Sequence, residues 1–224
     1  RRAGDIKIAL GRDNAPFSSV SGDGKMHGIL PDLYKRYGRM SGLSFSFVPV
    51  KDFSEAMKLL EAGSVSVIGQ MNEDRFYADN KGLLLTSPFM KLTLAQVTRK
   101  GNASVRTLAL PDGVAQLYDG GERSAEEHAP VVKRFNSAAD CFAALKKGQA
   151  DAMYCSTIAA NYLINRDRAE DFIISTLSSY SISLVAGTCA AKNRVIYSIL
   201  NRCIRFTSAS VLDELVLRNT IAEG

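Results

Sequence analysis

Apolar residues in the first third of the chain follow two alternating spacings, one typical of strands and one typical of helices. Residues 6–10 (IKIAL) form a short apolar run followed by a polar turn, which predicts a strand. The next apolar residues recur at intervals of three and four, which predicts a helix closed by Gly42: Ile29, Leu30, Leu33, Tyr34, Tyr37 and Met40. Leu43, Phe45 and Phe47 then alternate with polar residues, which predicts a second strand.

The same unit follows a second time. Ser54 is placed to cap a helix whose apolar face carries Phe53, Met57 and Leu60, and Gly63 supplies a left-handed stop before a strand at residues 65–68. Strands that alternate with helices of this length predict an α/β fold with a parallel or mixed sheet and helices on both faces.

One segment of the chain resembles a later one. SEAMKLLEAGSVSVI (54–68) and AADCFAALKKGQADAM (138–153) align at a shift of 85 residues, which matches Met57 with Phe142, Leu60 with Leu145 and Gly63 with Gly148. Any helix followed by a glycine and a strand would look similar, so the alternatives are a generic likeness and two similar α/β lobes. Two long extended stretches, 83–102 and 175–189, provide the two crossings that a pair of lobes requires.

The C-terminal part reads as two helices. From Asn193 to Phe206, apolar residues share one helical face, and a shorter amphipathic stretch covers 210–218. The residues of that face are Val195, Ile196, Ile199, Leu200 and Cys203.

Composition limits the class of protein. With 224 residues and 46% hydrophobic content the chain can form one large domain or two lobes, and it has no run of about 18 apolar residues that would span a membrane. Arg1 and Arg2 are not followed by an apolar segment, so a signal peptide is expected to be absent or already removed.

Charge and reactive residues exclude several functions. The net charge is +5, but the 28 Lys and Arg residues are scattered, which argues against nucleic acid and favours an anionic small ligand or an anionic membrane neighbourhood. The four cysteines lack CxxC spacing, and His27 and His128 are the only histidines. We therefore expect no metal, no cofactor and no Cys/His or Ser/His nucleophile.

Five motifs, in order, resemble the family 3 extracellular solute-binding proteins, the Venus flytrap modules with the type 2 periplasmic-binding-protein fold. They are IKIALGRDNAPF, GDGKMHGILPDLYKRY, LLEAGSVSVIGQMNEDR, LLLTSPF and AALKKGQADAM. The resemblance implies a discontinuous lobe 1 (1–91 and 187–224), a lobe 2 (92–186), and a ligand held in the cleft between them by a hinge motion.

Arg75 stands where members of this family usually keep an arginine that grips a ligand carboxylate. A planar guanidinium matches a carboxylate with two parallel hydrogen bonds, so the chemistry favours that role. The alternative is a surface charge, or an i,i+4 partner for Asp79 on a short helix that starts near Asn72.

The resemblance implies further lobe 1 contacts. Gln70, Met71 and Asn72 are expected at the mouth of the cleft, although Asn72 is also suited to cap the following helix. The loop after the first strand brings three more candidates, with turn chemistry as the alternative for the first two and lobe packing with one exposed edge for the third: Asp13, Asn14 and Phe17. We interpret Asp32 as a structural helix-start carboxylate.

Lobe 2 departs from the amino-acid-binding members. Cys155 and Ser156 stand where an acidic residue would receive a ligand ammonium, and the loop that usually carries a hydroxyl leaves Gln116 and Tyr118 as the polar candidates. This pattern favours a carboxylate with a less polar body over a standard α-amino acid held at both ends.

Flytrap modules serve as sensor domains of membrane-bound histidine kinases or diguanylate cyclases and as subunits of ABC importers. The irregular pocket and the loop at 69–89 favour an extracytoplasmic sensor, with an amino-acid importer subunit as the alternative. A cleft enzyme such as a dehydratase would need an acid/base pair, for which Asp13 finds no partner. A cytoplasmic regulator effector domain is disfavoured by the motif order.

The cysteines leave their pairing open. Cys141 and Cys155 are expected at neighbouring ends of an α/β unit, where an oxidising compartment would allow a disulfide, and Cys203 is expected as a buried small hydrophobe. With Cys189, four cysteines allow three complete pairings.

Overall fold

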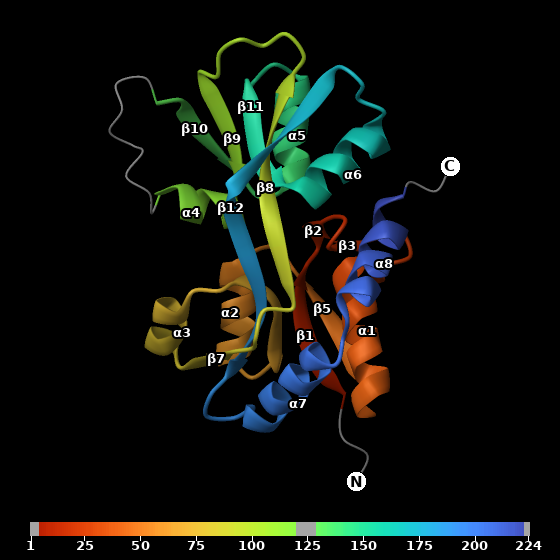
Figure 1. The fold of residues 1–224 in the computed structure, drawn as a ribbon. Coiled ribbons are helices and arrows are strands. Elements are labelled where there is room, and N and C mark those ends of the chain that lie inside the picture. The colour runs from red at the N-terminus through yellow and green to blue at the C-terminus, as the bar shows by residue number, and fades with distance from the viewer. Residues whose placement is uncertain (1–4, 120–128, 222–224) are drawn as a thin grey trace. The chain divides into compact units, whose positions relative to one another are not determined.

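The computed structural model describes residues 5–119 and 129–221. Arg1 and Arg2, on which the signal-peptide expectation depends, and His128 lie outside the described residues. The helices and strands alternate as the periodicity predicts, so the mixed α/β class is confirmed. Figure 1 shows the course of the chain.

The described chain forms two compact units. The first runs to Lys91 and resumes from Ile182 to Asn219, and the second runs from Leu92 to Ser181. The chain passes between them within two long strands, β8 (Met90–Arg99) and β12 (Phe172–Cys189), which occupy the two predicted extended stretches. The second unit begins at Leu92, within β8, and the chain returns to the first unit at Ile182, within β12. That the units act as two lobes around a ligand stays a prediction.

The first unit is built around a parallel sheet. Its central strand β1 (Ile6–Gly11) pairs in parallel with β5 (Phe45–Val50) and with β6 (Val67–Asn72), and β12 adds an antiparallel strand beside β6. The helices α1 (Ile29–Ser41) and α2 (Phe53–Glu61) form the two crossovers. A short strand β7 (Leu83–Leu85) pairs with β12.

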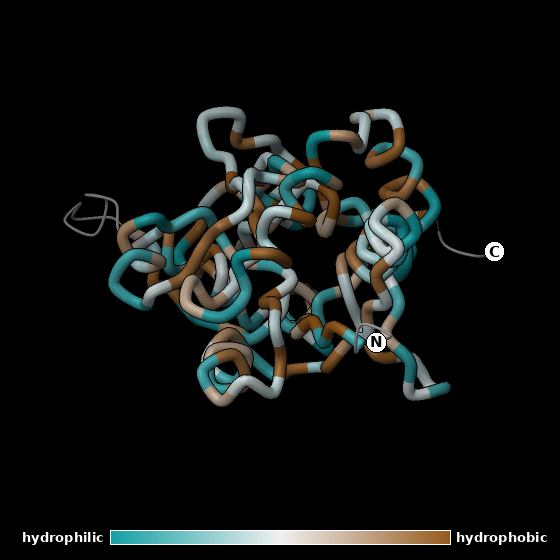
Figure 2. The backbone as a smooth tube through the Cα atoms, turned by 90° about the horizontal axis from the view of Figure 1, so that it is seen from below, coloured by the Kyte–Doolittle hydropathy of each residue, from teal (hydrophilic) through white to brown (hydrophobic). Residues whose placement is uncertain are grey.

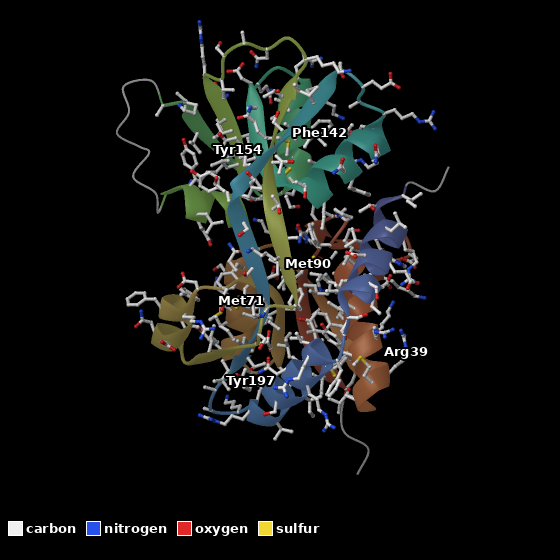
Figure 3. All side chains as sticks on the ribbon, viewed as in Figure 1. Arg39, Met71, Met90, Phe142, Tyr154 and Tyr197 are labelled. Atoms are coloured by element: carbon white, nitrogen blue, oxygen red, sulfur yellow. The ribbon has the colours of Figure 1, made fainter. Side chains whose placement is uncertain are left out.

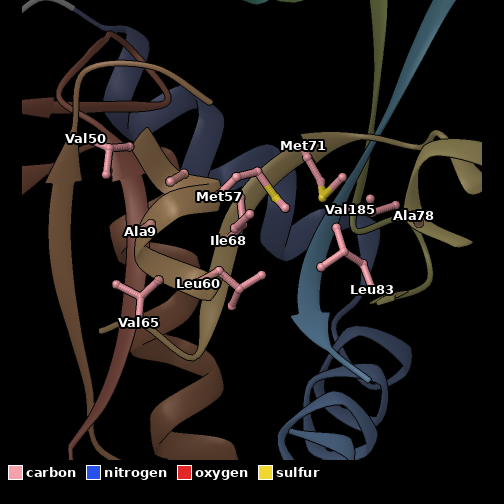
Figure 4. Packing of buried hydrophobic residues seen from close by; sticks show 11 residues of the cluster. Ala9, Val50, Met57, Leu60, Val65, Ile68, Met71, Ala78, Leu83 and Val185 are labelled. Atoms are coloured by element: carbon pink, nitrogen blue, oxygen red, sulfur yellow. The ribbon is translucent and has the colours of Figure 1, made fainter. Parts of the chain in front are cut away.

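Side-chain alternation assigns α1 and α2 to opposite faces of this sheet. Phe45 and Phe47 of β5 approach the Tyr34 ring of α1, with ring centroids 6.3 and 6.4 Å away. Val48 and Val50 belong instead to the cluster around α2. Figure 4 shows this cluster, in which Met57 and Leu60 of α2 lie against Ile68 of β6. Both faces of the sheet are therefore covered, as a parallel sheet requires.

A small three-stranded sheet stands between β1 and α1. It consists of β2 (Asp13–Asn14), β3 (Ser18–Val20) and β4 (Met26–His27). Gly28 follows at φ +130°, and a Cβ there would lie 2.5 Å from the Phe17 carbonyl oxygen, so only glycine fits before α1.

The second unit repeats the same plan. The strand β9 (Thr107–Pro111) pairs in parallel with β10 (Val131–Phe135) and with β11 (Ala152–Ser156), and β8 lies antiparallel to β11. Its helices are α4 (Asp112–Asp119), α5 (Ala138–Lys146) and α6 (Thr157–Asp167). The strand order β10-β9-β11-β8 corresponds to β5-β1-β6-β12 of the first unit.

The repeat detected in the sequence is confirmed in the structure. Shifting α2 by 85 residues gives the bounds of α5, and Gly63 and Gly148 both follow their helix with positive φ, +73° and +69°. The N-caps also correspond, because Asp52 and Ser137 each accept a hydrogen bond from the backbone N–H three residues on. The predicted cap at Ser54 was wrong, because α2 begins at Phe53 and Asp52 is the residue that precedes it.

The C-terminal helices pack on the first unit. α7 (Arg194–Arg205) buries Leu200 and Cys203, and α8 (Ala209–Thr220) is tied to α1 where Arg218 and Asn219 donate to the Asp32 carboxylate at 3.1 Å. Asp32 lies in the first turn of α1, so its structural role is confirmed. Val195 does not share the buried face, because it is 72% exposed at the start of α7.

Hydropathy along the backbone agrees with this layering. In Figure 2 the outlying turns of the tube are largely hydrophilic, and hydrophobic stretches lie on the inner strands and on one side of the helices. Burial of those stretches supplies the main free energy that stabilises each unit.

The repeat predicts that two truncations in the core reduce the free energy of unfolding by similar amounts. Leu60 is 4% exposed and Leu145 is 3% exposed. Because each substitution removes a buried side chain, Leu60→Ala and Leu145→Ala should each reduce the free energy of unfolding by about 2–5 kcal/mol. Urea denaturation measures this, with Val195→Ala as the control, whose cost should stay within about 0.5 kcal/mol. Near-zero costs at both leucines would contradict the packing described.

A carboxylate on α6 predicts how the second unit responds to acid. The pKa of Asp167 is lowered to about 2 by the hydrogen bond from Arg166 and by Lys146, against an ordinary 3.8. Because the folded pKa is the lower one, the stabilisation is present above about pH 4 and is lost as pH falls toward 2. Asp167→Asn should cost about 1 kcal/mol at pH 7 and show a smaller loss of stability below pH 4 than the parent, as measured by urea denaturation across pH.

Candidate functional site

The carboxyl ends of β1 and β6 lie side by side in the first unit, because the two strands are parallel neighbours. In open α/β sheets, ligands bind outside the carboxyl ends of such strands. The loop after β1 carries Asp13, Asn14 and Phe17, and the end of β6 carries Gln70, Met71 and Asn72. The fold therefore brings together two groups of candidates that lie far apart in the sequence.

A hydrogen bond joins the two groups. The Asn14 side-chain amide nitrogen donates to the Gln70 side-chain oxygen at 2.8 Å, and both residues are half-buried. Asp13 is exposed and pairs through its backbone with Ser19 of β3. The pair of amides leaves one oxygen and one nitrogen with hydrogen-bonding capacity, which suits a polar ligand group of either kind.

Two residues that the sequence did not indicate as site residues, Tyr34 and Gly69, position β6. The Tyr34 hydroxyl, on a side chain that is 1% exposed, donates to the Gly69 carbonyl oxygen at 2.6 Å. A Cβ at Gly69 would lie 2.5 Å from the Leu10 side chain and 2.7 Å from the Ile8 side chain, so any other residue there would force these buried side chains of β1 to shift. A glycine inside a strand pattern signals such close packing, and it could have been recognised in VIGQMN.

Arg75 opens α3 (Arg75–Lys81), one turn beyond the end of β6. Its guanidinium Nη2 lies 3.0 Å from Glu73 Oε1, and its side chain is 82% exposed. The partner is thus Glu73, and the expected i,i+4 pair with Asp79 is not the one formed. A cation at a helix N-terminus gains nothing from the helix dipole. Its place there is not explained by stability of α3.

The cap of α3 is Asp74. Its carboxylate accepts from the Tyr77 N–H at 2.9 Å, so the helix starts later than expected and Asn72 is not its cap. Asn72 is the last residue of β6, half-buried and aligned with Leu184 of β12. It therefore remains a candidate at the strand end.

Two candidates of the first unit are packed inside. Phe17 is 3% exposed, without the exposed edge that was expected, and Met71 is 7% exposed within the α2 cluster. Figure 3 shows Met71 on β6. A ligand contact for either side chain stays a prediction.

The second unit contributes four candidates on two elements. Gln116 is exposed on α4, and Tyr118 is half-buried with its ring centroid 6.5 Å from that of Tyr154 on β11 in an edge-to-face arrangement. Figure 3 shows where Tyr154 lies. Cys155 is 1% exposed, and the Ser156 hydroxyl accepts from the Ala159 N–H at 3.1 Å as the N-cap of α6. Neither Cys155 nor Ser156 offers a carboxylate that could bind a ligand ammonium group.

The described residues contain no group of three or more His, Cys, Asp or Glu that could hold a metal ion. Within the same ranges, no helix is long and apolar enough to cross a membrane.

These features define a class of protein. Two α/β units of one plan, with two strands passing between them, constitute the type 2 periplasmic-binding-protein fold, or Venus flytrap module. The chain belongs to the bacterial extracellular solute-binding proteins, family 3, whose family model matches residues 6–210.

Known relatives include sensor proteins. The virulence sensor protein BvgS of Bordetella bronchiseptica is 24% identical over 98% of this chain, and the chain spans 18% of the length of that relative. The periplasmic VFT2 domain of Bordetella pertussis BvgS superposes with a TM-score of 0.82 at 23% identity, covering 95% of this chain and 92% of that one. A histidine kinase sensor domain with similarity to periplasmic binding proteins gives 0.80 at 16% identity, covering 99% and 97%. These likenesses show the fold.

All four cysteines are free thiols in the structure, including Cys141 and Cys155. Cys141, Cys155 and Cys203 are buried, as expected for Cys203, whereas Cys189 is half-buried. Burial raises the pKa of Cys155 to about 12 and raises that of Cys141 as well. The thiolate, which is the reactive form, is therefore scarce at neutral pH in the buried residues.

Burial predicts selective thiol labelling. Iodoacetamide at pH 7.5 should modify Cys189 in the folded protein and all four cysteines after denaturation, because denaturation exposes the buried thiols. Mass spectrometry of the peptides measures this. Two cysteines that resist labelling in the denatured, unreduced protein would instead indicate a disulfide.

Proposed function

We propose that this chain is the extracytoplasmic ligand-sensing module of a membrane-bound signalling protein, such as a histidine kinase or a diguanylate cyclase. Its ligand is a small molecule that carries a carboxylate. The family consists of extracellular solute-binding proteins, which supports the extracytoplasmic location, and relatives named as sensors support the signalling role over that of an importer subunit.

The observation that carries the proposal is the Asn14–Gln70 hydrogen bond at the carboxyl ends of β1 and β6. It fixes two polar side chains where α/β sheets bind ligands, and both amides retain donors or acceptors for a further partner. Tyr34 and Gly69 hold the strand end beneath them, so the pair is positioned before any ligand arrives.

Arg75 supplies the charge for the carboxylate. It is three residues beyond the end of β6, and its guanidinium is exposed except for one contact with Glu73. A carboxylate ligand could take both parallel donors of the fork, which is a stronger arrangement than the single contact with Glu73. We therefore infer that ligand binding exchanges Glu73 for the ligand carboxylate.

The residues of the second unit indicate the rest of the ligand. Cys155 and Ser156 carry no charge, and Gln116 and Tyr118 offer an amide and a phenol. An ammonium group would find no carboxylate among these four side chains. The proposed ligand body is thus uncharged or weakly polar, and binding without chemical change is the proposed activity.

A thermal-shift screen tests the proposal. Amino acids, dicarboxylates, aromatic acids, small peptides and sugars are tested against the purified chain, and a ligand at 100 times its Kd should stabilise it by about 2.7 kcal/mol. Carboxylates should give the hits. Arg75→Ala should abolish the shift while leaving the melting temperature without ligand nearly unchanged, because the side chain is exposed.

Lys81→Ala is the matched control, since it removes another exposed cation from the same helix and should retain the shift. Equal binding by Arg75→Ala would remove Arg75 from the site. A hit that proton NMR shows to be converted during incubation would contradict a pure binding role.

A further inference from the structure

A hollow lies on the first unit between the C-terminal end of α1 and α7. Its volume is about 580 Å³. It is lined by Met40 and Ser41 of α1 and by residues on or next to the last turns of α7: Ile199, Arg202, Cys203 and Phe206. None of these residues belongs to the candidate ligand site, so the hollow is a separate feature.

Two contacts join α1 to α7 and the residues after it at this hollow, so its position is fixed by the fold. The Cys203 thiol donates to the Tyr37 carbonyl oxygen at 3.7 Å, and the Thr207 hydroxyl lies 3.7 Å from the Met40 sulfur. Cys203 is 4% exposed and lies deep, whereas Phe206 is 67% exposed and Met40 is 40% exposed. A recessed floor with exposed apolar walls is typical of a pocket that receives a protruding side chain.

The surroundings of the hollow are strongly basic. Arg202 lines the hollow and Arg205 lies in the same last turn of α7, and the last two turns of α1 contain Arg36 and Arg39; neither segment contains an acidic residue. Figure 3 shows Arg39 on the outer side of α1. In the described part of the chain, no ion pair is formed by Arg36, Arg39, Arg202 or Arg205.

The helix dipole explains only part of this charge. Arg39, Arg202 and Arg205 lie in last turns, where cations are favourable, but Arg36 lies one turn before Met40. The Arg36 Nε atom is buried and has no hydrogen-bond partner among the described residues.

We propose that this hollow is a docking surface for an acidic amphipathic helix of a partner protein. An apolar side chain of that helix enters between Met40, Ile199 and Phe206, and carboxylates one turn before and after it pair with the surrounding arginines. An apolar centre with arginines at its edge is the usual composition of a protein interface. The recess argues against a flat bilayer, whose surface would not reach Cys203.

A fluorescein-labelled helical peptide with a central leucine flanked by glutamates at i−4 and i+4 tests the surface. Fluorescence anisotropy should show binding that weakens as NaCl rises from 50 to 500 mM. The same peptide with glutamine in place of glutamate should bind at least tenfold more weakly, and a lysine version should not bind.

Variants of the protein locate the contact. Arg202→Gln/Arg205→Gln and, separately, Phe206→Ser should each weaken binding at least fivefold, with folding checked by melting temperature. Lys100→Gln/Lys147→Gln is the matched control, since it removes two exposed cations from the second unit and should leave binding unchanged. Arg202→Lys/Arg205→Lys should retain most of the binding.

Three outcomes would overturn the proposal. They are equal binding of the glutamate and lysine peptides, equal binding by the arginine variants, and arginine-dependent binding to phosphatidylglycerol vesicles in the absence of peptide binding. The last would assign the surface to an anionic membrane. The thermal-shift screen is independent of all three, because its residues lie elsewhere on the chain.

Discussion

The close parallel pairing of β1 with β6 is the constraint on which the first unit depends. Glycine at position 69 fits this pairing, because a side chain there would force the buried side chains of Leu10 and Ile8 to shift. The Tyr34 hydroxyl then anchors the same residue from α1. This pairing brings Asn14 within 2.8 Å of Gln70 and sets the direction in which the chain leaves toward Arg75. The packing of the core and the geometry of the candidate site thus both depend on the pairing of β1 with β6.

The second unit repeats the plan but not the chemistry. α2 and α5 have matching caps, matching apolar positions and matching left-handed glycines, which shows that the repeat preserves what the helix and strand need to pack. The strand ends differ: β6 ends on an amide and leads to an arginine, whereas β11 ends on a buried thiol and a capping hydroxyl. We therefore expect the charged group of the proposed ligand to bind to the first unit.

Three arginines of the first unit have different surroundings. Arg75 follows the end of β6 with Glu73 beside it. Arg202 lines the hollow between α1 and α7, and among the described residues it forms no ion pair. Arg218 is different again, since it is used internally to tie α8 to Asp32. Arg75, Arg202 and Arg218 thus belong to a proposed ligand site, a proposed partner surface and the internal packing of the fold, respectively.

The sequence by itself determined the alternation of elements, the internal repeat, the family and the loops that carry the candidates, because periodicity, glycines and motif order are local properties. Only the tertiary structure decided that Phe17 and Met71 face inward, that Asp74 rather than Asn72 caps α3, that Val195 is exposed, and that Asn14 bonds Gln70. The contact of Asn14 with Gln70 joins elements that are 56 residues apart, and no local pattern specifies it. The burial of Phe17 and Met71 and the exposure of Val195 depend on what packs against each element. Asn72 does not cap α3 because it pairs with Leu184 of β12 as the last residue of β6.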